Sequence, residues 1–203
     1  MSPGSEPAAN AAAEAEPDPV DPTATRAPLD AARARQMAPH ADRDVRADPE
    51  SELTSEWVGG PESGYLKQGL SRDGKKEGVW RMYDSEGRVL MECSYEAGRL
   101  HGTMTMWRPE GFKAQESQYV DGRLDGVVRG WHSNGNEAFR QTYRDGVLEG
   151  EAFEWFPDGS LQSQGSNHDG LASGNWLCYS SPGVLDAARS GHYERGARVG
   201  DSQ

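Results

Sequence analysis

Between residues 64 and 200, short apolar runs alternate with polar turn sequences. Runs such as GVWRMY, GTMTMW and GVVRGW are rich in aromatic and branched residues, which favours β-strands. A turn sequence such as RPEG, HSNG or FPDG follows each run, and a second run then leads to Asp-Gly or a close relative of it. Asp-Gly between two strand-like runs is a strong hairpin signal. The pattern therefore predicts a succession of β-hairpins.

These hairpins repeat with a step of 24 residues. Three glycine series keep this step: Gly74, Gly98, Gly122, Gly146 and Gly170; Gly78, Gly102, Gly126, Gly150 and Gly174; and Gly87, Gly111, Gly135, Gly159 and Gly183. One aromatic series stays in the same register: Tyr83, Trp107, Trp131, Trp155 and Tyr179. A second series runs through Tyr95, Tyr119 and Tyr143 and stops at Asn167. Such a register over five copies predicts a repeat architecture.

The glycines stand where the chain reverses. Pro109 and Pro157 fit the first central position of a type I turn, and the glycine that follows then supplies the positive φ of a three-residue loop with a bulge. In the fifth copy, Pro182 and Gly183 fit a type II turn over residues 181–184 instead. Two extra residues then precede Tyr193, so the fifth copy is expected to be an atypical capping repeat.

The pattern Tyr-x-x-Gly-x-x-x-Gly-x-aromatic, followed by a turn glycine, resembles the bacterial variant of the MORN repeat. The resemblance covers roughly residues 64–200. It implies an all-β fold, namely an elongated single-layer antiparallel meander of 24-residue β-hairpin repeats whose strands run across the long axis. It also implies a binding or scaffolding role without catalytic residues. Some bacterial members of this family are labelled antitoxin-like.

Two regions are expected along the chain. Residues 1–55 are an acidic Ala/Pro-rich tail with 5 basic and 11 acidic side chains and no sustained apolar periodicity, which predicts disorder. Residues 56–203 hold the array, which consists of a half-copy, five copies and a terminal half-copy. The formal net charge of the chain is −12. Negative charge argues against nucleic acid and anionic lipid and favours a protein partner with a basic or neutral surface.

Peripheral membrane or lipid binding stays open as the alternative, because the family name suggests it. The chain shows neither the apolar run of a signal peptide nor a run of transmembrane length, so a cytoplasmic location is expected. Cys93 and Cys178 fall seven strand steps apart in the array, or roughly 34 Å. That separation excludes a disulfide between them and predicts two reduced, packed thiols.

No motif for catalysis or for phosphate, cofactor or metal binding is present. The five histidines (His40, His101, His132, His168 and His192) fall mostly in or beside predicted turns, without a Cys or a second His at metal-ligand spacing. They are expected to be solvated loop residues. Glu92 and Glu116 share one repeat position, but Arg140 and Gln164 occupy the same position, so this acidic pair is expected to be ordinary strand surface.

The candidate partner-binding residues are the five members of the first aromatic series: Tyr83, Trp107, Trp131, Trp155 and Tyr179. Hairpin geometry places them on one face, about 9.6 Å apart, as an aromatic ladder. They can cover the backbone of a single-layer sheet, or they can form an exposed groove for a partner. If they form a groove, we expect its centre at Trp107, Trp131 and Trp155, with Glu149, Glu151 and Glu154 as an acidic rim.

Overall fold

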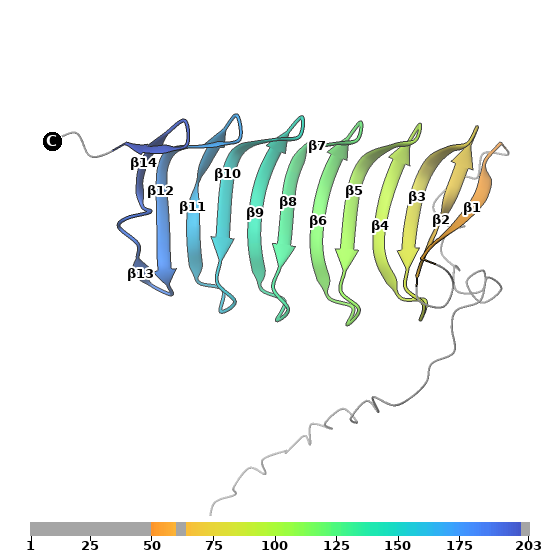
Figure 1. Cartoon of the computed structure of the whole chain (residues 1–203), viewed down its shortest axis with the longest axis horizontal. Helices are drawn as coiled ribbons and strands as arrows, with labels where there is room; N and C mark the ends of the chain where they lie inside the picture. Colours follow the sequence, from red (N-terminus) through yellow and green to blue (C-terminus); the bar gives the residue numbers. More distant parts are fainter. Residues whose placement is uncertain (1–49, 60–63, 200–203) are drawn as a thin grey trace, which may run out of the picture.

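The computed structural model describes residues 50–59 and 64–199, which form one open antiparallel sheet without a helix (Figure 1). The strands run across the long axis of a single layer, so the predicted all-β meander is confirmed. Most of the expected tail lies outside the described residues. The first strand begins at Glu52, however, so the array starts four residues before the boundary that the sequence suggests.

The first half of the sheet contains β1 (Glu52–Val58), β2 (Tyr65–Arg72), β3 (Lys75–Tyr83), β4 (Val89–Glu96), β5 (Arg99–Trp107), β6 (Lys113–Val120) and β7 (Arg123–Leu124). The second half contains β8 (Gly126–Trp131), β9 (Glu137–Arg144), β10 (Val147–Trp155), β11 (Leu161–His168), β12 (Leu171–Ser181), β13 (Val184–Leu185), β14 (Gly191–Glu194) and β15 (Ala197–Val199). Neighbours in sequence are neighbours in space, with the short β7 beside β6 and the short β13 beside β12.

The Asp-Gly turns lie at the upper edge of the sheet in Figure 1. Both central residues have positive φ, for example 51° at Asp121 and 83° at Gly122, as a type I′ turn requires. The upper turns from Gly98 onward are also bonded to the copy before them. The Gly122 amide donates to the Leu100 carbonyl at 2.7 Å, and the Gly146 amide donates to the Leu124 carbonyl at 2.7 Å. A row of such bonds joins consecutive hairpins along the upper edge.

The lower turns contain the predicted bulges. The pairing of β5 with β6 shifts between Met106 and Trp107, and Gly111 in the following loop has a φ of 89°. In the fifth copy, Gly183 has a φ of 74°, which agrees with the predicted type II turn. A bulge inserts one extra residue into a strand. Two side chains three positions apart, one on each side of the bulge, therefore point to the same face.

The face opposite the ladder holds aromatic rings that lie over glycines of the neighbouring strand. A Cβ added to Gly69 would lie 2.4 Å from the ring of Trp80, and one added to Gly165 would lie 2.2 Å from the ring of Trp176. Trp80 is only 3% exposed. Its Nε1 donates to the Leu70 carbonyl at 2.8 Å, and its ring meets Tyr95 edge-on. A ring that lies over a glycine covers the backbone of the neighbouring strand, so a single-layer sheet is shielded locally without a second layer.

The two cysteines lie on this same sheet as separate buried thiols. Cys93 is on β4 and Cys178 on β12, seven strand positions apart, and neither forms a disulfide. Burial raises the pKa of both thiols. The prediction of two reduced, packed cysteines is confirmed.

Candidate interaction surface

The aromatic ladder occupies the lower ends of alternate strands. Four members close β3, β5, β8 and β10, and Tyr179 lies two residues before the end of β12; each is just before or at a bulge. Equivalent register places all five on one face, which we call the ladder face. The arrangement follows directly from the 24-residue step, since one step equals two strands.

A second row of side chains alternates with the ladder on the strands between. The cross-strand partners of the ladder are Val89 for Tyr83, Lys113 for Trp107, Glu137 for Trp131, Leu161 for Trp155 and Leu185 for Tyr179. This second row is therefore aliphatic at both ends of the array and charged in its middle. The ladder face is divided into three parts with different chemistry.

At the N-terminal end the ladder is a packing element. Tyr83 is 7% exposed and forms a small core with Leu66, which is 2% exposed, while Trp57 and Val89 pack against them. Burial raises the pKa of the Tyr83 hydroxyl, and the nearby Arg81 opposes that shift. Tyr83 therefore presents little surface to a partner, although the sequence suggests it as a binding residue.

In the centre, ion pairs lie among the tryptophans. The Lys113 ammonium is 5.7 Å from the ring centre of Trp131 and 2.7 Å from a Glu116 carboxylate oxygen. One copy further on, the Arg140 guanidinium lies 5.3 Å from the ring centre of Trp155. It also binds Glu137 through two bonds of 2.6 and 3.0 Å. The bulges make both pairs possible, because their members are three residues apart on one strand.

These central cations compete with any partner for the faces of the rings. A cation over an aromatic ring contributes roughly 0.5–1 kcal/mol at an exposed site. Trp107 and Trp131 are half-buried beside them. The centre of the ladder is consequently a mixed surface whose charged side chains pair with one another and with the rings. It is less apolar than the ladder residues alone suggest.

The C-terminal end of the ladder face exposes aromatic and aliphatic side chains. Phe153 and Trp155 stack with their ring centres 5.7 Å apart at an interplanar angle of 12°. Leu177 and Leu185 nearby are 40% and 51% exposed. We call the following set the C-terminal apolar patch: Phe153, Trp155, Leu161, Leu177, Tyr179 and Leu185. Sequence reasoning missed it, although residues 161 and 185 stand at the same repeat position as Lys113 and Glu137.

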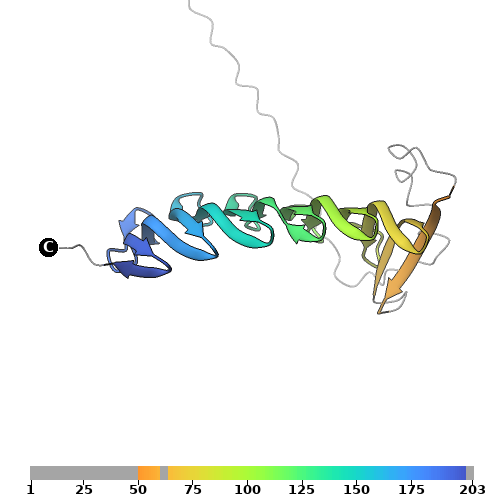
Figure 2. The same ribbon diagram turned by 90° about the horizontal axis from the view of Figure 1, so that it is seen from above.

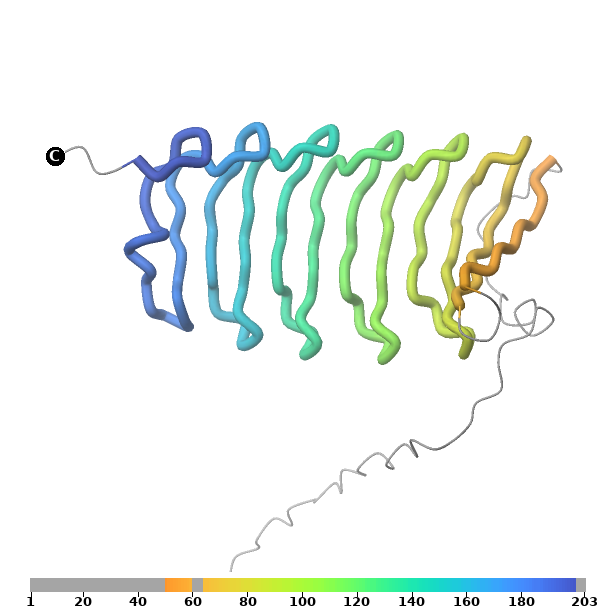
Figure 3. Tube along the Cα trace, viewed as in Figure 1, coloured from red at the N-terminus to blue at the C-terminus, as the bar shows by residue number. Residues whose placement is uncertain are grey.

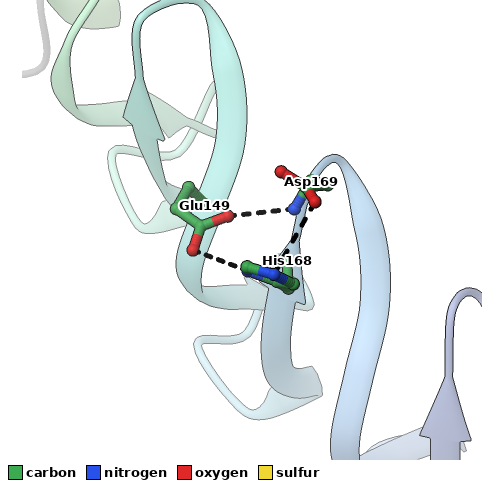
Figure 4. A group of neighbouring side chains, drawn as sticks. All are labelled: Glu149, His168 and Asp169. Carbon is green, nitrogen blue, oxygen red and sulfur yellow. Dashed lines mark hydrogen bonds and ion pairs between the residues drawn. The ribbon is translucent and has the colours of Figure 1, made fainter.

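The expected acidic rim does not form. Strand alternation places Glu151 on the ladder face, whereas Glu154 is on the opposite face, where it accepts a bond from Ser163 at 3.0 Å. Glu149 lies at the upper edge and bonds to residues of the next hairpin (Figure 4). Three acidic residues close in sequence thus end in three different places.

Glu149 braces the next upper turn. One carboxylate oxygen lies 2.9 Å from His168 Nδ1, and the other accepts the Asp169 amide at 2.9 Å (Figure 4). His168 Nε2 lies 3.6 Å from the Asp169 carboxylate. His168 is exposed, as expected, but it has a specific acidic partner that the sequence did not indicate. Ligand atoms of the three side chains lie within 4.8 Å of one another, and both oxygens of Glu149 are already engaged by this turn.

The bond to Glu149 raises the pKa of His168 above its usual 6.5, and the bond to His168 lowers the pKa of Glu149 below its usual 4.5. The contribution of His168 to folding is complete below about pH 6.5 and is lost as pH rises through the raised value. The contribution of Glu149 is complete above about pH 4.5 and is lost as pH falls through the lowered value. The pair therefore acts fully between about pH 4.5 and 6.5.

Glu149→Gln is expected to bring the pKa of His168 back toward 6.5, as measured by NMR titration of the imidazole protons. Asp169→Asn serves as the matched control. It should lower the same pKa by less, because Asp169 acts on His168 only through its charge. An unchanged His168 pKa in Glu149→Gln would show that the contact does not form in solution.

Comparisons with known proteins find a family match for two stretches of the repeat array. Residues 76–97 and 148–167, which cover much of β3–β4 and β10–β11, match the MORN repeat variant. No curated protein matches the chain significantly. Among 24 matching solved chains, the structure titled "Crystal Structure of TarM" has a TM-score of 0.31 and 8% identity over 45% of this chain and 18% of that one. The structure of accessory secretory protein 1, 2 and 3 in Streptococcus pneumoniae has a TM-score of 0.29 and 18% identity over 56% and 20%.

The chain thus spans about a fifth of the length of these two solved chains. Among residues 50–59 and 64–199, no helix is long and apolar enough to span a membrane. MORN repeats are generally modules for interaction with proteins or membranes, and their family is generally non-enzymatic. With two matched stretches inside one 24-residue register, the chain contains MORN-variant repeats.

Proposed function

We propose that the protein is a non-enzymatic interaction or scaffold module that binds a protein partner through the ladder face. The C-terminal apolar patch is the observation that carries this proposal. A contiguous apolar surface on a sheet face, bordered by charged side chains, is typical of a protein-binding site. Trp155 and Tyr179 belong to the patch, whereas Trp107 and Trp131 lie beyond it in the charged centre of the ladder face. Tyr83 supports the fold.

The charge of the chain indicates the kind of partner. The formal net charge of −12 steers a basic or neutral protein toward the array and repels anionic surfaces. On the ladder face itself, Lys113, Glu116, Glu137 and Arg140 neutralise one another. Specific affinity on this face therefore depends on apolar contact. An antitoxin role would be one form of this function, with a neighbouring gene product as the partner.

Glutamate substitution at the exposed leucines of the patch tests the proposal. Leu177→Glu and Leu185→Glu are expected to weaken binding of a partner captured by the wild-type chain by about 30-fold, the equivalent of about 2 kcal/mol. Affinity would be measured by calorimetry with the purified partner. Both leucines are substantially exposed, so the melting temperature should stay near that of the wild type.

Val147→Glu is the matched control, because Val147 is 43% exposed but lies at the upper edge, outside the patch. Equal loss of binding in the control would assign the effect to added charge. Unchanged binding in both patch variants would remove the ladder face as the site. Sedimentation with vesicles of phosphatidylcholine and phosphatidylserine tests the lipid alternative. Binding to these vesicles without a protein partner would favour that alternative.

A further inference from the structure

Strand β1 forms an exposed edge of the sheet. It pairs with β2 along its whole length, from Glu52 opposite Ser71 to Val58 opposite Tyr65, without a register shift. On its other side no strand pairs with it among residues 50–59 and 64–199. Natural proteins blunt such edges with charged side chains, especially lysine, or with proline, bulges or very short strands. The sequence ELTSEWV has no lysine, proline or bulge, and its charged side chains are Glu52 and Glu56. Seen from above, β1 and β2 also turn away from the line of the array (Figure 2).

The opposite edge of the sheet is closed. Short strands cover the outer side of β12 in two places, β14 toward the top and β13 toward the bottom. Between them, the Ser190 hydroxyl accepts the Cys178 amide at 2.9 Å and donates to the Cys178 carbonyl at 3.1 Å. The Asp186 amide donates to the same carbonyl at 2.8 Å. The last strand, β15, is only three residues long. The tube drawing shows this asymmetry between the two ends of the array (Figure 3).

The two faces of β1 have different chemistry. Trp57 lies opposite Leu66, so alternation places Leu53 and Trp57 on the ladder face. Glu52 and Glu56 fall on the other face, where both are exposed. Neither carboxylate forms an ion pair among the described residues, although Glu56 lies directly opposite Lys67 of β2. An incoming strand would therefore meet apolar side chains on one face and two exposed carboxylates on the other.

We propose that β1 is a docking edge at which an extended segment of a basic partner protein adds as the next strand of the sheet. Strand addition supplies main-chain hydrogen bonds, and the alternating side chains supply specificity. Cross-strand pairing with Glu52 and Glu56 requires Lys or Arg at two positions four residues apart. Apolar side chains at the alternate positions would then lie beside Leu53 and Trp57. This proposal is independent of binding at the C-terminal apolar patch.

A second copy of the chain does not fit this edge. ELTSEWV carries two carboxylates and no base, so β1 of another molecule brings no cation to Glu52 or Glu56. Each chain also has a formal net charge of −12, which opposes self-association. Like charges near one another across two strands are unfavourable. The edge thus favours a basic partner and disfavours its own copy.

A synthetic peptide of the sequence Val-Lys-Val-Thr-Val-Lys-Val tests the edge with the full chain. Hydrogen exchange read by mass spectrometry is expected to show new protection of residues 52–58 when the peptide is present. Glu52→Lys combined with Glu56→Lys should weaken peptide binding about tenfold and should favour the peptide that has Glu in place of Lys. The matched control is Glu110→Lys combined with Glu194→Lys. It changes the net charge equally at exposed sites away from β1 and should leave binding nearly unchanged.

A peptide methylated at alternate backbone nitrogens separates strand addition from simple charge attraction. It keeps both lysines but loses main-chain donors, so its binding should disappear. Equal binding of the methylated peptide, or no new protection at residues 52–58, would overturn the proposal. Protection that grows with protein concentration alone would assign the edge to a second copy. Protection without peptide at every concentration would assign it to another part of the same chain.

Discussion

Gly69→Ala is expected to lower the free energy of unfolding by about 3 kcal/mol, the range found for overpacked interiors. The added methyl group would lie 2.4 Å from Cγ of Trp80, and the ring cannot move away freely. Its indole nitrogen is bonded to the Leu70 carbonyl at 2.8 Å, and the Lys76 ammonium, from the same strand β3, lies 4.2 Å from the ring centre. Gly69 lacks a positive φ, so the cost is steric. Chemical denaturation would measure it.

A double-mutant cycle gives the control. Trp80→Ala alone is expected to cost about 3–5 kcal/mol, because a nearly buried ring is removed. Adding Gly69→Ala to that variant should cost much less than it does in the wild type, since the clashing ring is gone. Strictly additive costs would contradict the stacking of Trp80 on Gly69. The equivalent change at Gly165 should be milder, because Trp176 is only half-buried.

Deleting residues 109–132 is expected to leave a folded array that is one copy shorter. The junction joins Arg108 to Ser133, which recreates a lower turn in the original register because the deletion equals one 24-residue step. Strand direction, face and upper-turn bonding are all kept. In repeat arrays, stability is approximately a sum over units and their interfaces, so the melting temperature should fall without loss of cooperative folding. Circular dichroism and thermal unfolding would follow this change.

Deleting residues 109–120 is the corresponding half-step. It removes β6 alone, so β8 would have to run in the direction that β6 had. Every later strand would then be inverted end to end, and the upper-turn amides such as Gly146 would no longer face the carbonyls of the preceding copy. We expect the C-terminal half to lose protection from hydrogen exchange. A fully protected half-step variant would show that the register of the turns does not determine the fold.

The fold could be predicted from the sequence because its determinants are local. Asp121 and Gly122 form a type I′ turn for reasons contained in two residues, and the same two residue types recur at a fixed step. Once the turns are placed, strand order and face follow. The two cysteines illustrate the same point, since their separation required only a count of strands.

The surface was harder to predict because it depends on which residues meet across strands. The aromatic series was visible in the sequence, but Lys113 beside Trp131 and Arg140 over Trp155 arise from cross-strand pairs combined with a bulge. The repeat position of Lys113 holds Val89, Lys113, Glu137, Leu161 and Leu185 in the five copies. A comparison of these residues would have shown two charged residues between aliphatic ones. The sequence therefore contained this signal, but sequence reasoning did not use it.

Other contacts left only a partial pattern. Trp80 on Gly69 recurs four steps later as Trp176 on Gly165, but Phe139 on Gly130 occupies a different repeat position. The bond between Glu149 and His168 joins two hairpins across 19 residues. Glu77 and Asp125 stand at the repeat position of Glu149 and accept the Ala97 and Asp145 amides, but the residue at the position of His168 changes from copy to copy. Such contacts depend on how much space a particular neighbour leaves, and that space is known only when the strands are packed.

The row of strands across the long axis also determines how the molecule responds to tension. Hydrogen bonds between antiparallel strands are perpendicular to the strands, so in this array they point along its length. A force that pulls the two ends of the chain apart loads the edge strand at one end and peels its bonds one after another. Each hairpin that detaches frees 24 residues, or about 80 Å of extended chain. The protein would lengthen in equal steps at low force, as an extensible tether does, while the remaining hairpins keep their structure.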